Sequence, residues 1–511
     1  MDFFTVMAGS ASVLTDPYVW LLIILGTIFG IVIGAMPGVG QTLAYGLVLP
    51  FTFVMAPVPA VAFLLAISVG CAYGNSLPAI LIGVPGTPGA VMTAMDGYAM
   101  QKAGAGAMAL ATQYVAAIVG QLISIPMFVL MVVPLSGLAY VFLPPELFCL
   151  YLIGMVAIIS LAGKSMVKGV AAGLTGLLVG LVGLDPITSL PRYVVVPEIR
   201  NGFSVVAVVI GVLAVSELFR QSRQVFQYDM SVVGKVPKFP SFTELRPTFF
   251  PILQGTITGT LIGAIPGASG TTAALMAYNT AKIFSKHPEL FGEGAIEGIA
   301  ANEAAQNASN SGELVPTLGL GIPASGSMVL LLAALMVHGM LPGPQMMTQT
   351  PGLVYAAVAG MFAATLILMV IGWKCATLMV RVVGIDRQLV IIGSLALIVV
   401  GVFSVQSRMV DVLICLLFGV LGYFMLRYGY ATAALALAAV IATGFEQTLR
   451  RGLSLFDNNI VTFASRPITL FLLVVAGLLL SYGVYAEFKT RKRVAAALRL
   501  KESVQPAQAG S

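Results

Sequence analysis

The sequence predicts an all-α, polytopic integral membrane protein of about 11–14 spans, at roughly 20 residues per span, with two structural repeats that contain discontinuous or re-entrant helices. Its composition and an internal repeat support this prediction. Of the 511 residues, 59% are hydrophobic and only 9% are charged, whereas an ordinary globular domain is about 25% charged. So few charges cannot cover the surface of a soluble protein of this length, which excludes a water-soluble enzyme.

A glycine-rich motif occurs twice. Residues 26–38 read GTIFGIVIGAMPG and residues 255–267 read GTITGTLIGAIPG, so nine of 13 positions are identical at an offset of 229. A second set of residues recurs at an offset of 238: Gly74, Pro78, Gly83 and Pro85 match Gly312, Pro316, Gly321 and Pro323. Two ordered matches with similar offsets indicate two homologous halves. Whether the halves are inverted or parallel stays open, because it depends on the number of spans in each half.

Two basic segments flank the second half. The stretch from Arg220 to Arg246 contains five cations and two acids, and the chain from Glu487 onward contains six cations and two acids. Lys and Arg concentrate in the cytoplasmic loops of membrane proteins. We therefore expect a first transmembrane repeat at 1–220, a polar cytoplasmic connector at 221–246, a second transmembrane repeat at 247–445, a terminal span region at 446–485 and a basic cytoplasmic tail at 486–511.

Each copy of the first motif ends in a cluster of helix breakers and hydroxyls, at Pro37-Gly38 and at Pro266-Gly267. Broken backbone at membrane depth needs protein or water as its hydrogen-bond partner, because lipid offers none. A helix that restarts there points unpaired N–H groups and the positive end of its dipole into a cavity, which suits an anion. The alternative is a tight turn near the membrane surface.

The second pair of motifs follows the same logic. Residues Gly83–Gly89 and Gly321–Ser327 are expected to form unwound or re-entrant elements whose hydroxyls and amides can contact a ligand. The residues predicted to bind substrate are Gly38, Gly40, Thr42, Asn75, Ser76, Thr87, Gly267, Ser269, Gly270, Thr271, Ser325 and Ser327.

Both glycine-rich motifs lack Lys and Arg, so we expect an anion bound there to have no arginine partner. A helix terminus contributes only about 0.3–1 kcal/mol toward an anion, and removing water from a di- or tricarboxylate costs much more. A co-bound Na⁺ or H⁺ would help to neutralise the anion, and we therefore expect ion-coupled transport. The candidate ion-coupling residues are Pro37, Pro85, Pro266, Pro323, Asp96, Glu303, Asn307 and Asn310.

The densest polar segment, residues 293–313, allows two interpretations. Glu303, Asn307 and Asn310 share one helical face, and an acid inside the membrane is a functional candidate. Alternatively, the segment is a solvated helix at the membrane edge, because basic residues precede it. Asp96 is open to the same two interpretations.

The sequence points away from metal, cofactor and enzyme chemistry. The four cysteines have no CxxC spacing and there are only two histidines, so we expect no metal site and no other cofactor. The HExxH, GxSxG, Walker A and Rossmann motifs are missing from the sequence, so we expect neither an enzyme nor an ATP-driven pump. The membrane rule explains the basic tail, and no nucleic-acid partner is expected.

Seven motifs lie within about residues 26–106 and 255–344: GTIFGIVIGAMPGVG, YGNSLPAILIGVPGTPGA, MDGYAM, GTITGTLIGAIPGASGT, FGEGAIEGIAANEAAQNAS, ELVPTLGLGIPASGS and HGMLPGP. Their order and spacing resemble the large membrane subunit of the tripartite tricarboxylate transporters. The resemblance implies a multi-pass protein of the bacterial inner membrane, with a cytoplasmic C-terminus. It also implies two partners in and beside the lipid bilayer: a small membrane subunit and a periplasmic substrate-binding protein. Asn75, Ala99 and Ala324 depart from the family's usual pattern, so the particular carboxylate stays open.

We therefore expect the large permease subunit of a binding-protein-dependent secondary transporter. It would import di- or tricarboxylates such as citrate by alternating access, driven by a sodium or proton gradient. Two other classes stay open. One is an intramembrane enzyme acting on lipid-like substrates, for which only Glu297 and Glu303 could supply paired acids. The other is a passive channel.

Overall fold

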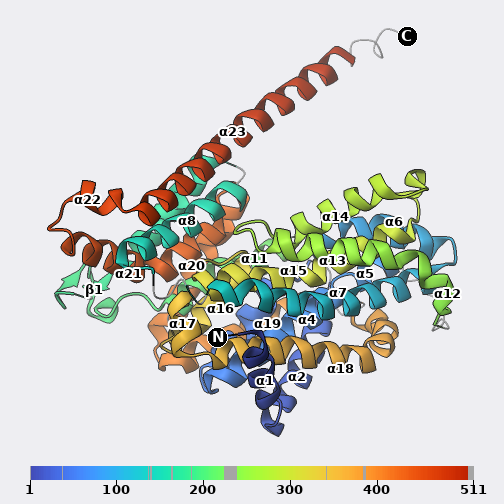
Figure 1. Ribbon diagram of the computed structural model, residues 1–511, viewed down its shortest axis with the longest axis horizontal. Coiled ribbons are helices and arrows are strands. Elements are labelled where there is room, and N and C mark those ends of the chain that lie inside the picture. The colour runs from blue at the N-terminus through green and yellow to red at the C-terminus, as the bar shows by residue number, and fades with distance from the viewer. Residues whose placement is uncertain are drawn as a thin grey trace.

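The computed structural model describes residues 2–36, 38–135, 137, 141–162, 165–185, 187–223, 239–340, 342–383 and 387–504. These residues are almost entirely helical (Figure 1). Within them, eight helices are long and apolar enough to cross a membrane, and four shorter apolar helices accompany them. This confirms the expected all-α, polytopic class. The span number of 11–14 and the boundaries given for the repeats, connector and tail stay predictions.

The first half contains a run of apolar helices with short breaks. Its elements are α1 (Phe3–Val13), α2 (Pro17–Gly34), α3 (Gln41–Thr52), α4 (Pro57–Gly74), α5 (Leu77–Ile82), η1 (Pro88–Ala90), α6 (Val91–Lys102), α7 (Gly106–Leu135), α8 (Pro144–Ala162), α9 (Met166–Gly180), β1 (Gly183–Leu184), β2 (Pro191–Arg192), η3 (Pro197–Ile199), α10 (Val205–Ile210), η4 (Gly211–Val215) and α11 (Ser216–Gln221). The π-helical segment η4 joins α10 to α11 without a break, and β1 pairs with β2 in an antiparallel hairpin.

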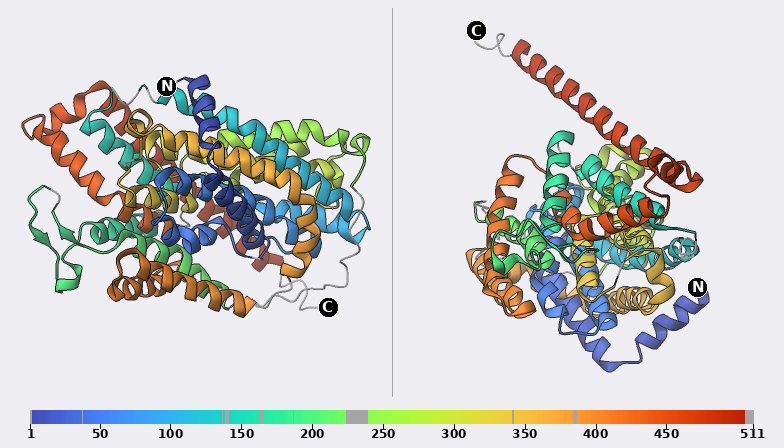
Figure 2. Two further views of the ribbon diagram at one scale, coloured as in Figure 1. Left: turned by 90° about the horizontal axis from the view of Figure 1, so that it is seen from below. Right: turned by 90° about the vertical axis from the view of Figure 1, so that its left-hand side faces the viewer.

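The second half repeats the early order of elements and adds a long C-terminal helix. Its elements are α12 (Phe242–Leu245), η6 (Arg246–Thr248), α13 (Phe249–Gly263), α14 (Gly270–Phe284), η7 (Pro288–Leu290), α15 (Ile296–Leu320), α16 (Gly326–Val337), α17 (Pro344–Gln349), α18 (Gly352–Val383), α19 (Arg387–Gln406), α20 (Met409–Arg427), α21 (Thr432–Ser454), α22 (Ile460–Ser465) and α23 (Pro467–Val504). Helix α23 extends well beyond the rest of the protein (Figures 1 and 2).

Helices α2 and α4 pack in parallel along the glycine stripe of the first motif. A Cβ added to Gly30 would lie 2.4 Å from the carbonyl oxygen of Ile67, and one added to Gly34 would lie 2.6 Å from that of Cys71. Because both helices run in the same direction, α3 must return the chain to the side where α2 began. Its 12 residues cover about 18 Å, less than the roughly 30 Å of a bilayer core. Helices α2 and α3 therefore form a re-entrant hairpin.

The second motif builds the same arrangement. A Cβ added to Gly259 would lie 2.3 Å from the carbonyl oxygen of Ala305, and one added to Gly263 would lie 2.8 Å from that of Ser309. Helices α13 and α15 are therefore parallel, and α14 is the returning arm. Glycine is required at the two tips, where Gly38 has φ +79° and Gly267 has φ +81°, a conformation that other residues adopt at a cost.

Contacts along α7 fix the direction of the second hairpin relative to the rest of the chain. Gly120 lies against Ala304. Val132, further along α7, lies against Gly319, further along α15. Position increases along both helices, so α7 runs parallel to α15. Helices α7, α13 and α15 therefore share one direction.

Helix α18 runs the other way. The hydroxyl of Tyr114 near the start of α7 donates to the carbonyl of Met369 at 2.6 Å, whereas Gln121 one turn or two later meets Met361. Position decreases along α18 as it increases along α7. The two helices are therefore antiparallel.

The same helix α18 is parallel to α4, which relates the two halves. Gly360 lies against Ala62, and the Tyr73 hydroxyl donates to the carbonyl of Gly372 at 3.0 Å. Helices α2 and α4 therefore run opposite to α13 and α15. The two hairpins enter the protein from opposite sides, so the motif copies are inverted, a question that the sequence left open.

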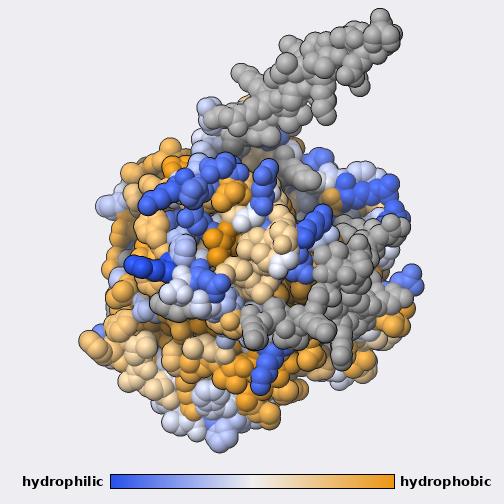
Figure 3. Space-filling model, turned by 90° about the vertical axis from the view of Figure 1, so that its right-hand side faces the viewer, coloured by the Kyte–Doolittle hydropathy of each residue, from blue (hydrophilic) through white to orange (hydrophobic). Residues whose placement is uncertain are grey.

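The helix ends gather at two faces of the protein. Figure 1 shows the β1–β2 hairpin and α22 at one end, and α6 and α12 at the other. We call these the hairpin side and the connector side. Seen from the connector side, hydrophilic residues are scattered over the middle and upper part of the face, and hydrophobic residues line its left and lower edges (Figure 3).

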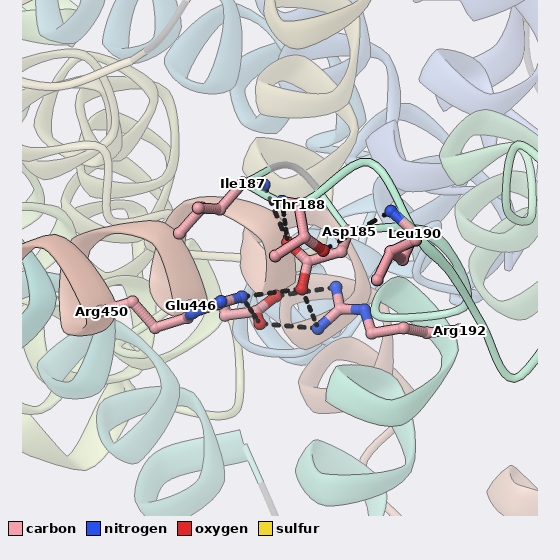
Figure 4. A network of polar contacts seen from close by, with 7 residues as sticks. All are labelled: Asp185, Ile187, Thr188, Leu190, Arg192, Glu446 and Arg450. Atoms are coloured by element: carbon pink, nitrogen blue, oxygen red, sulfur yellow. Dashed lines mark hydrogen bonds and ion pairs between the residues drawn. The ribbon is translucent and has the colours of Figure 1, made fainter.

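A network of ion pairs holds the β1–β2 hairpin against α21 (Figure 4). Asp185 accepts hydrogen bonds from the backbone N–H groups of Ile187 and Thr188 at 2.8 and 3.0 Å, and from Arg450 at 2.8 Å. Arg192 forms two hydrogen bonds to Glu446, at 2.6 and 2.9 Å. These contacts join a loop to the C-terminal turns of a helix more than 250 positions away.

The same contacts shift the titration of Asp185. The backbone N–H of Ile187 and then the guanidinium of Arg450 hold the pKa of Asp185 well below its ordinary value. A carboxylate with a depressed pKa stabilises the folded state fully above its ordinary pKa, and this stabilisation declines as pH falls toward the folded pKa.

Alanine at Gly259 is expected to destabilise the protein, because its Cβ would collide with the carbonyl oxygen of Ala305 in the α13–α15 contact. Forcing atoms into such a contact costs about 1–3 kcal/mol. The thermal unfolding midpoint of the detergent-purified Gly259→Ala variant measures this. Gly393→Ala is the matched control, because nothing lies within 4 Å of its Cβ position. Equal midpoints for the two variants would contradict the close packing of the hairpin.

Acid is expected to release the β1–β2 hairpin. The anchoring contribution of Asp185 is complete at neutral pH and declines below about pH 4, the ordinary range of an aspartate. Hydrogen–deuterium exchange of residues 187–203, corrected for the intrinsic rate, should rise below that pH. In Asp185→Asn it should already be fast at pH 7 and change little with pH. An unchanged exchange rate in Asp185→Asn would show that the network does not anchor the hairpin.

Candidate functional site

A cavity of about 420 Å³ lies where the two hairpin tips meet. The tip of the first hairpin contributes residues 40–43, and the tip of the second contributes residues 269–271. The helix breaks that follow α5 and α15 contribute residues 86–88 and 325–327. Residues of α4 and its C-cap Asn75, and residues of η4, α11, α15, α20 and α21, complete the wall. The cavity is therefore built from both halves of the chain.

Ten of the twelve residues predicted to bind substrate line this cavity. They are Gly38, Gly40, Thr42, Asn75, Thr87, Ser269, Gly270, Thr271, Ser325 and Ser327. The other two serve the protein's own framework: the N–H of Gly267 donates to the carbonyl of Ala324 at 3.0 Å, and the hydroxyl of Ser76 donates to Glu303 at 2.7 Å. The structure brings the ten together, and their contact with a ligand stays a prediction.

Three helices of 12 or more residues begin at the cavity wall: α3, α14 and α16. Their N-cap residues are Gly40, Ser269 and Ser325, and none of these three forms a side-chain cap to its own helix. The first N–H groups of a helix lack intrahelical partners, and the dipole places partial positive charge there. The wall therefore favours negatively charged groups.

Glu313 already meets the start of α14. One of its carboxylate oxygens accepts the N–H of Gly270 at 3.1 Å, and the other accepts the hydroxyl of Ser325 at 2.5 Å. The Ser325 and Ser327 oxygens lie 2.9 Å apart. Glu313 lines the cavity and was missed by the sequence analysis. The repeat could have identified it, because Glu313 follows the matched Gly312 as Asn75 follows Gly74.

A cation lies at the cavity rim. Arg220, near the end of α11, lines the cavity and pairs with Glu217 at 2.5 and 2.8 Å. Tertiary packing therefore brings an arginine to the cavity although both glycine-rich motifs lack one. The expectation that a bound anion has no arginine partner stays a prediction. The side chain of Arg220 is 43% exposed, so the cavity opens at the connector-side end of α11.

Glu303 is fully buried between the two halves. Its first carboxylate oxygen accepts hydrogen bonds from Ser76 at 2.7 Å, from Thr93, and from Asn302 at 3.4 Å. The second oxygen has no hydrogen-bond partner among the described residues. Residues 298–319 of α15 are all buried, so the alternative of a solvated loop helix is wrong for this segment.

Two amides on the same helix were also predicted to couple ions. Asn307 is fully buried and donates to the carbonyl of Glu303 at 3.0 Å. Asn310 is 5% exposed and lines the cavity. Its Nδ2 has no acceptor within the part of the chain that the structure describes. A buried donor without an acceptor is unfavourable, so Asn310 is a natural contact for a bound anion.

Asp96 lies apart from the cavity lining. One of its oxygens accepts three backbone N–H groups, from Gly292 at 2.7 Å and from Gly294 and Ala295 at 3.0 Å. The other accepts the Tyr278 hydroxyl at 2.9 Å. Asp96 thus ties α6 to the loop that precedes α15. Its suggested role in ion coupling stays a prediction, but its contacts are those of a structural anchor.

Three of the four predicted prolines stand beside helix breaks in the described part of the chain. Pro85, Pro266 and Pro323 are not among the residues that line the cavity, and Pro37 lies outside the described residues. Each of the three is followed by a residue whose backbone forms a hydrogen bond. The N–H of Gly86 donates to the carbonyl of Asn75, and the N–H of Gly267 donates to the carbonyl of Ala324. Prolines here end helices, and their assignment to ion coupling stays a prediction.

Comparison with known proteins identifies the family. The family model of the "Tripartite tricarboxylate transporter TctA family" matches residues 20–437, which carry every element that lines the cavity. The chain belongs to this family. As a member of it, the chain is a component of a tricarboxylate-transporter system and a multi-pass membrane protein.

Two curated relatives come from Agrobacterium vitis. The "Uncharacterized 52.8 kDa protein in TAR-I ttuC' 3'region" is 32% identical over 458 residues, which are 89% of this chain and 91% of the relative. The "Uncharacterized protein in TAR-II ttuC' 3'region" is 33% identical over 215 residues, which are 42% of this chain and 89% of the relative. No solved structure matches the chain.

Asp96→Ala and Asp96→Asn are expected to separate anchoring from ion coupling. Alanine leaves four buried donors without an acceptor, which costs at least about 1–3 kcal/mol and should lower the unfolding midpoint strongly. Asparagine keeps the oxygen that accepts the three N–H groups, so stability and any ion-dependent uptake should persist. Loss of ion dependence in a stable Asp96→Asn variant would instead assign Asp96 a coupling role.

Proposed function

We propose that the chain is the large permease subunit of a binding-protein-dependent, ion-gradient-driven secondary transporter. It imports a small di- or tricarboxylate by alternating access. The observation that supports this most is the convergence of three helix N-termini from two inverted halves on one cavity. Inverted repeats with discontinuous helices around a shared site are a recurring architecture of secondary transporters.

The cavity suits a small multivalent anion. Its volume of about 420 Å³ falls in the range of about 300–1,000 Å³ typical of small-molecule sites. Among the described residues, the starts of α3 and α16 have no side-chain cap and the Nδ2 of Asn310 has no acceptor. Together with the guanidinium of Arg220, they offer positive or donor groups to a ligand. A substrate with two or three carboxylates would engage several of them at once.

Import against a gradient needs a second, favourable ion. Glu303 and Glu313 place two acids within the helical core, and a bound anion adds further negative charge. A cation that enters with the substrate offsets this repulsion. The buried polar groups on α15, from Glu303 to Asn310, support coupling to Na⁺ or H⁺ along this helix.

The inverted hairpins also supply a means of alternating access. The exposed side chain of Arg220 supports an opening of the cavity at the connector-side end of α11. Movement of one half against the other would close this mouth and expose the tips toward the hairpin side. The bound groups would stay at the tips while the surrounding helices rock.

Charge supports an orientation in the bacterial inner membrane. The connector and the tail are rich in Lys and Arg, which favours the cytoplasm for both. The hairpin side would then face the periplasm, where a substrate-binding protein delivers its cargo. The windows at Gln388–Gln406 and Pro467–Tyr485 are only 22% buried, which leaves apolar surface for lipid and for the small membrane subunit.

Uptake of labelled di- and tricarboxylates into proteoliposomes tests this function. The reconstituted complex should show saturable accumulation that requires both an ion gradient and the binding protein. Gly40→Asp should weaken substrate binding at least about tenfold, or roughly 1.4 kcal/mol, because it places a competing carboxylate at the start of α3. The backbone at Gly40 is extended, with φ −103°, so it allows a side chain. A Cβ added there would lie 3.2 Å from Cγ2 of Thr87, a contact that aspartate and serine share.

Gly40→Ser is the matched control, because serine is also a good N-cap but adds no charge. It should keep most of the uptake. Equal uptake by the aspartate and serine variants would remove the proposed anion site from the first hairpin. Flux that neither saturates nor accumulates substrate would favour a passive channel instead.

A further inference from the structure

The two halves differ in charge at one matched position of the cavity. Glu313 and Asn75 follow the glycines Gly312 and Gly74, which match at an offset of 238. Both line the cavity. Asn75 accepts hydrogen bonds from Ser76 at 3.0 Å and Gln306 at 3.3 Å through its side-chain oxygen. An inverted scaffold thus carries a carboxylate on one wall and a neutral amide on the other.

Glu313 occupies the position that an anionic ligand would take in the second half. Its carboxylate already accepts the first N–H of α14, at Gly270, and the hydroxyl of the α16 N-cap, Ser325. At the first hairpin, the N-cap of α3 is Gly40, which has no side chain to accept from the helix. The anion-binding capacity of the first hairpin is therefore free, whereas that of the second is taken.

A buried, unpartnered donor is present in the same cavity. Asn310 lines the cavity with a side chain that is 5% exposed, and its Nδ2 atom has no acceptor among the described residues. An acceptor supplied by a ligand would satisfy it. Glu313 lies three residues further along α15, so the donor and the carboxylate lie about one helical turn apart.

We propose that Glu313 binds the driving cation, and that a substrate carboxylate binds at the start of α3 and at Asn310. The proposal rests on the transport function proposed above. The cation is monovalent: either a proton, which bonds to a carboxylate oxygen, or Na⁺, which pairs with the carboxylate and neighbouring hydroxyls. In both cases Glu313 is neutralised on binding and becomes negative again on release.

Charge repulsion makes this pairing obligatory. Among the described residues, the charged side chains that line the cavity are Glu217, Arg220 and Glu313. Glu217 and Arg220 pair with each other at the rim, so the charge of Glu313 has no cation beside it. A substrate carboxylate in the same cavity meets that charge unless a cation has neutralised it. Substrate and cation therefore bind together.

Nearby polar groups support cation exchange at Glu313. The hydroxyls of Ser325 and Ser327 connect its carboxylate to the cavity through contacts of 2.5 and 2.9 Å. On α3, the buried Tyr45 is the titratable group that interacts with Glu313 electrostatically. Glu303 lies on the same helix but is enclosed by Ser76, Thr93 and Asn302, away from the cavity lining.

Glu313→Gln tests the proposal in the reconstituted complex, because glutamine resembles the neutralised carboxylate and cannot release a cation. Gradient-driven accumulation should fall from its wild-type level to a ratio of about one. Substrate counterflow, which needs no net cation movement, should persist, and substrate affinity should lose its dependence on pH or Na⁺. Separate proton and Na⁺ gradients applied to the wild type identify which cation is used.

Two further variants keep the test decisive. Glu313→Asp retains an ionisable group and should keep ion-dependent accumulation at a reduced rate. Glu289→Gln makes the same chemical change at an exposed acid outside the cavity and should match the wild type. A substrate-induced shift of the unfolding midpoint reports whether each variant folds and binds.

Three results would overturn the assignment. Glu313→Gln that still accumulates substrate in an ion-dependent way removes Glu313 from coupling. A folded Glu313→Gln protein that loses counterflow and substrate binding makes Glu313 a substrate contact. Loss of coupling in Glu313→Asp but not in Glu313→Gln contradicts the charge argument. A wild-type complex that neither exchanges nor accumulates any carboxylate would refute the transport function itself.

Discussion

The architecture depends on satisfying peptide groups where helices break inside an apolar protein. Lipid cannot pair with these groups, so each break needs another part of the chain. The carbonyl of Gly38 accepts from the side chain of Gln221, the N–H of Gly267 donates to Ala324, and the N–H of Gly86 donates to Asn75. Each tip is thus held by a distant segment. Among the described residues, the N-caps of α3 and α16 at the cavity form no side-chain hydrogen bond to their helices, so framework and candidate site arise from the same constraint.

Close helix packing makes these breaks coincide. The glycine stripes let α2 approach α4, and α13 approach α15, until the glycines lie directly against the backbone of the neighbouring helix. Gly30 and Gly259 are examples. Small residues at helix contacts are a general means of association in membranes, where apolar burial gives no advantage over lipid. Because the stripes end at the tips, the packing fixes how deep each hairpin reaches. Two glycine stripes of the same spacing, which run in opposite directions, therefore bring both hairpin tips to the same cavity.

The sequence predicted the parts that repeat and missed those that depend on tertiary packing. The offsets of 229 and 238 identified both tips and both later breaks, and ten of the chosen residues line one cavity. Arg220 reaches the rim from a segment that looked like the start of a polar connector, so no local pattern marked it. The inversion depends on helix directions, which the sequence does not encode locally. Glu313 was predictable from the repeat, because it follows the matched Gly312 as Asn75 follows Gly74.

Inverted symmetry by itself gives two equivalent walls, and two equivalent walls cannot distinguish an anion from the cation that accompanies it. A single difference at a matched position removes that equivalence. Glu313 adds a carboxylate where Asn75 presents an amide, and the same helix geometry then favours a cation on one side and an anion on the other. The breaks that create the cavity are conserved in shape between the halves of this chain, whereas its charge is not. The shared shape therefore provides the cavity. The difference in charge between its two walls can make binding of the anion at one wall depend on binding of the cation at the other.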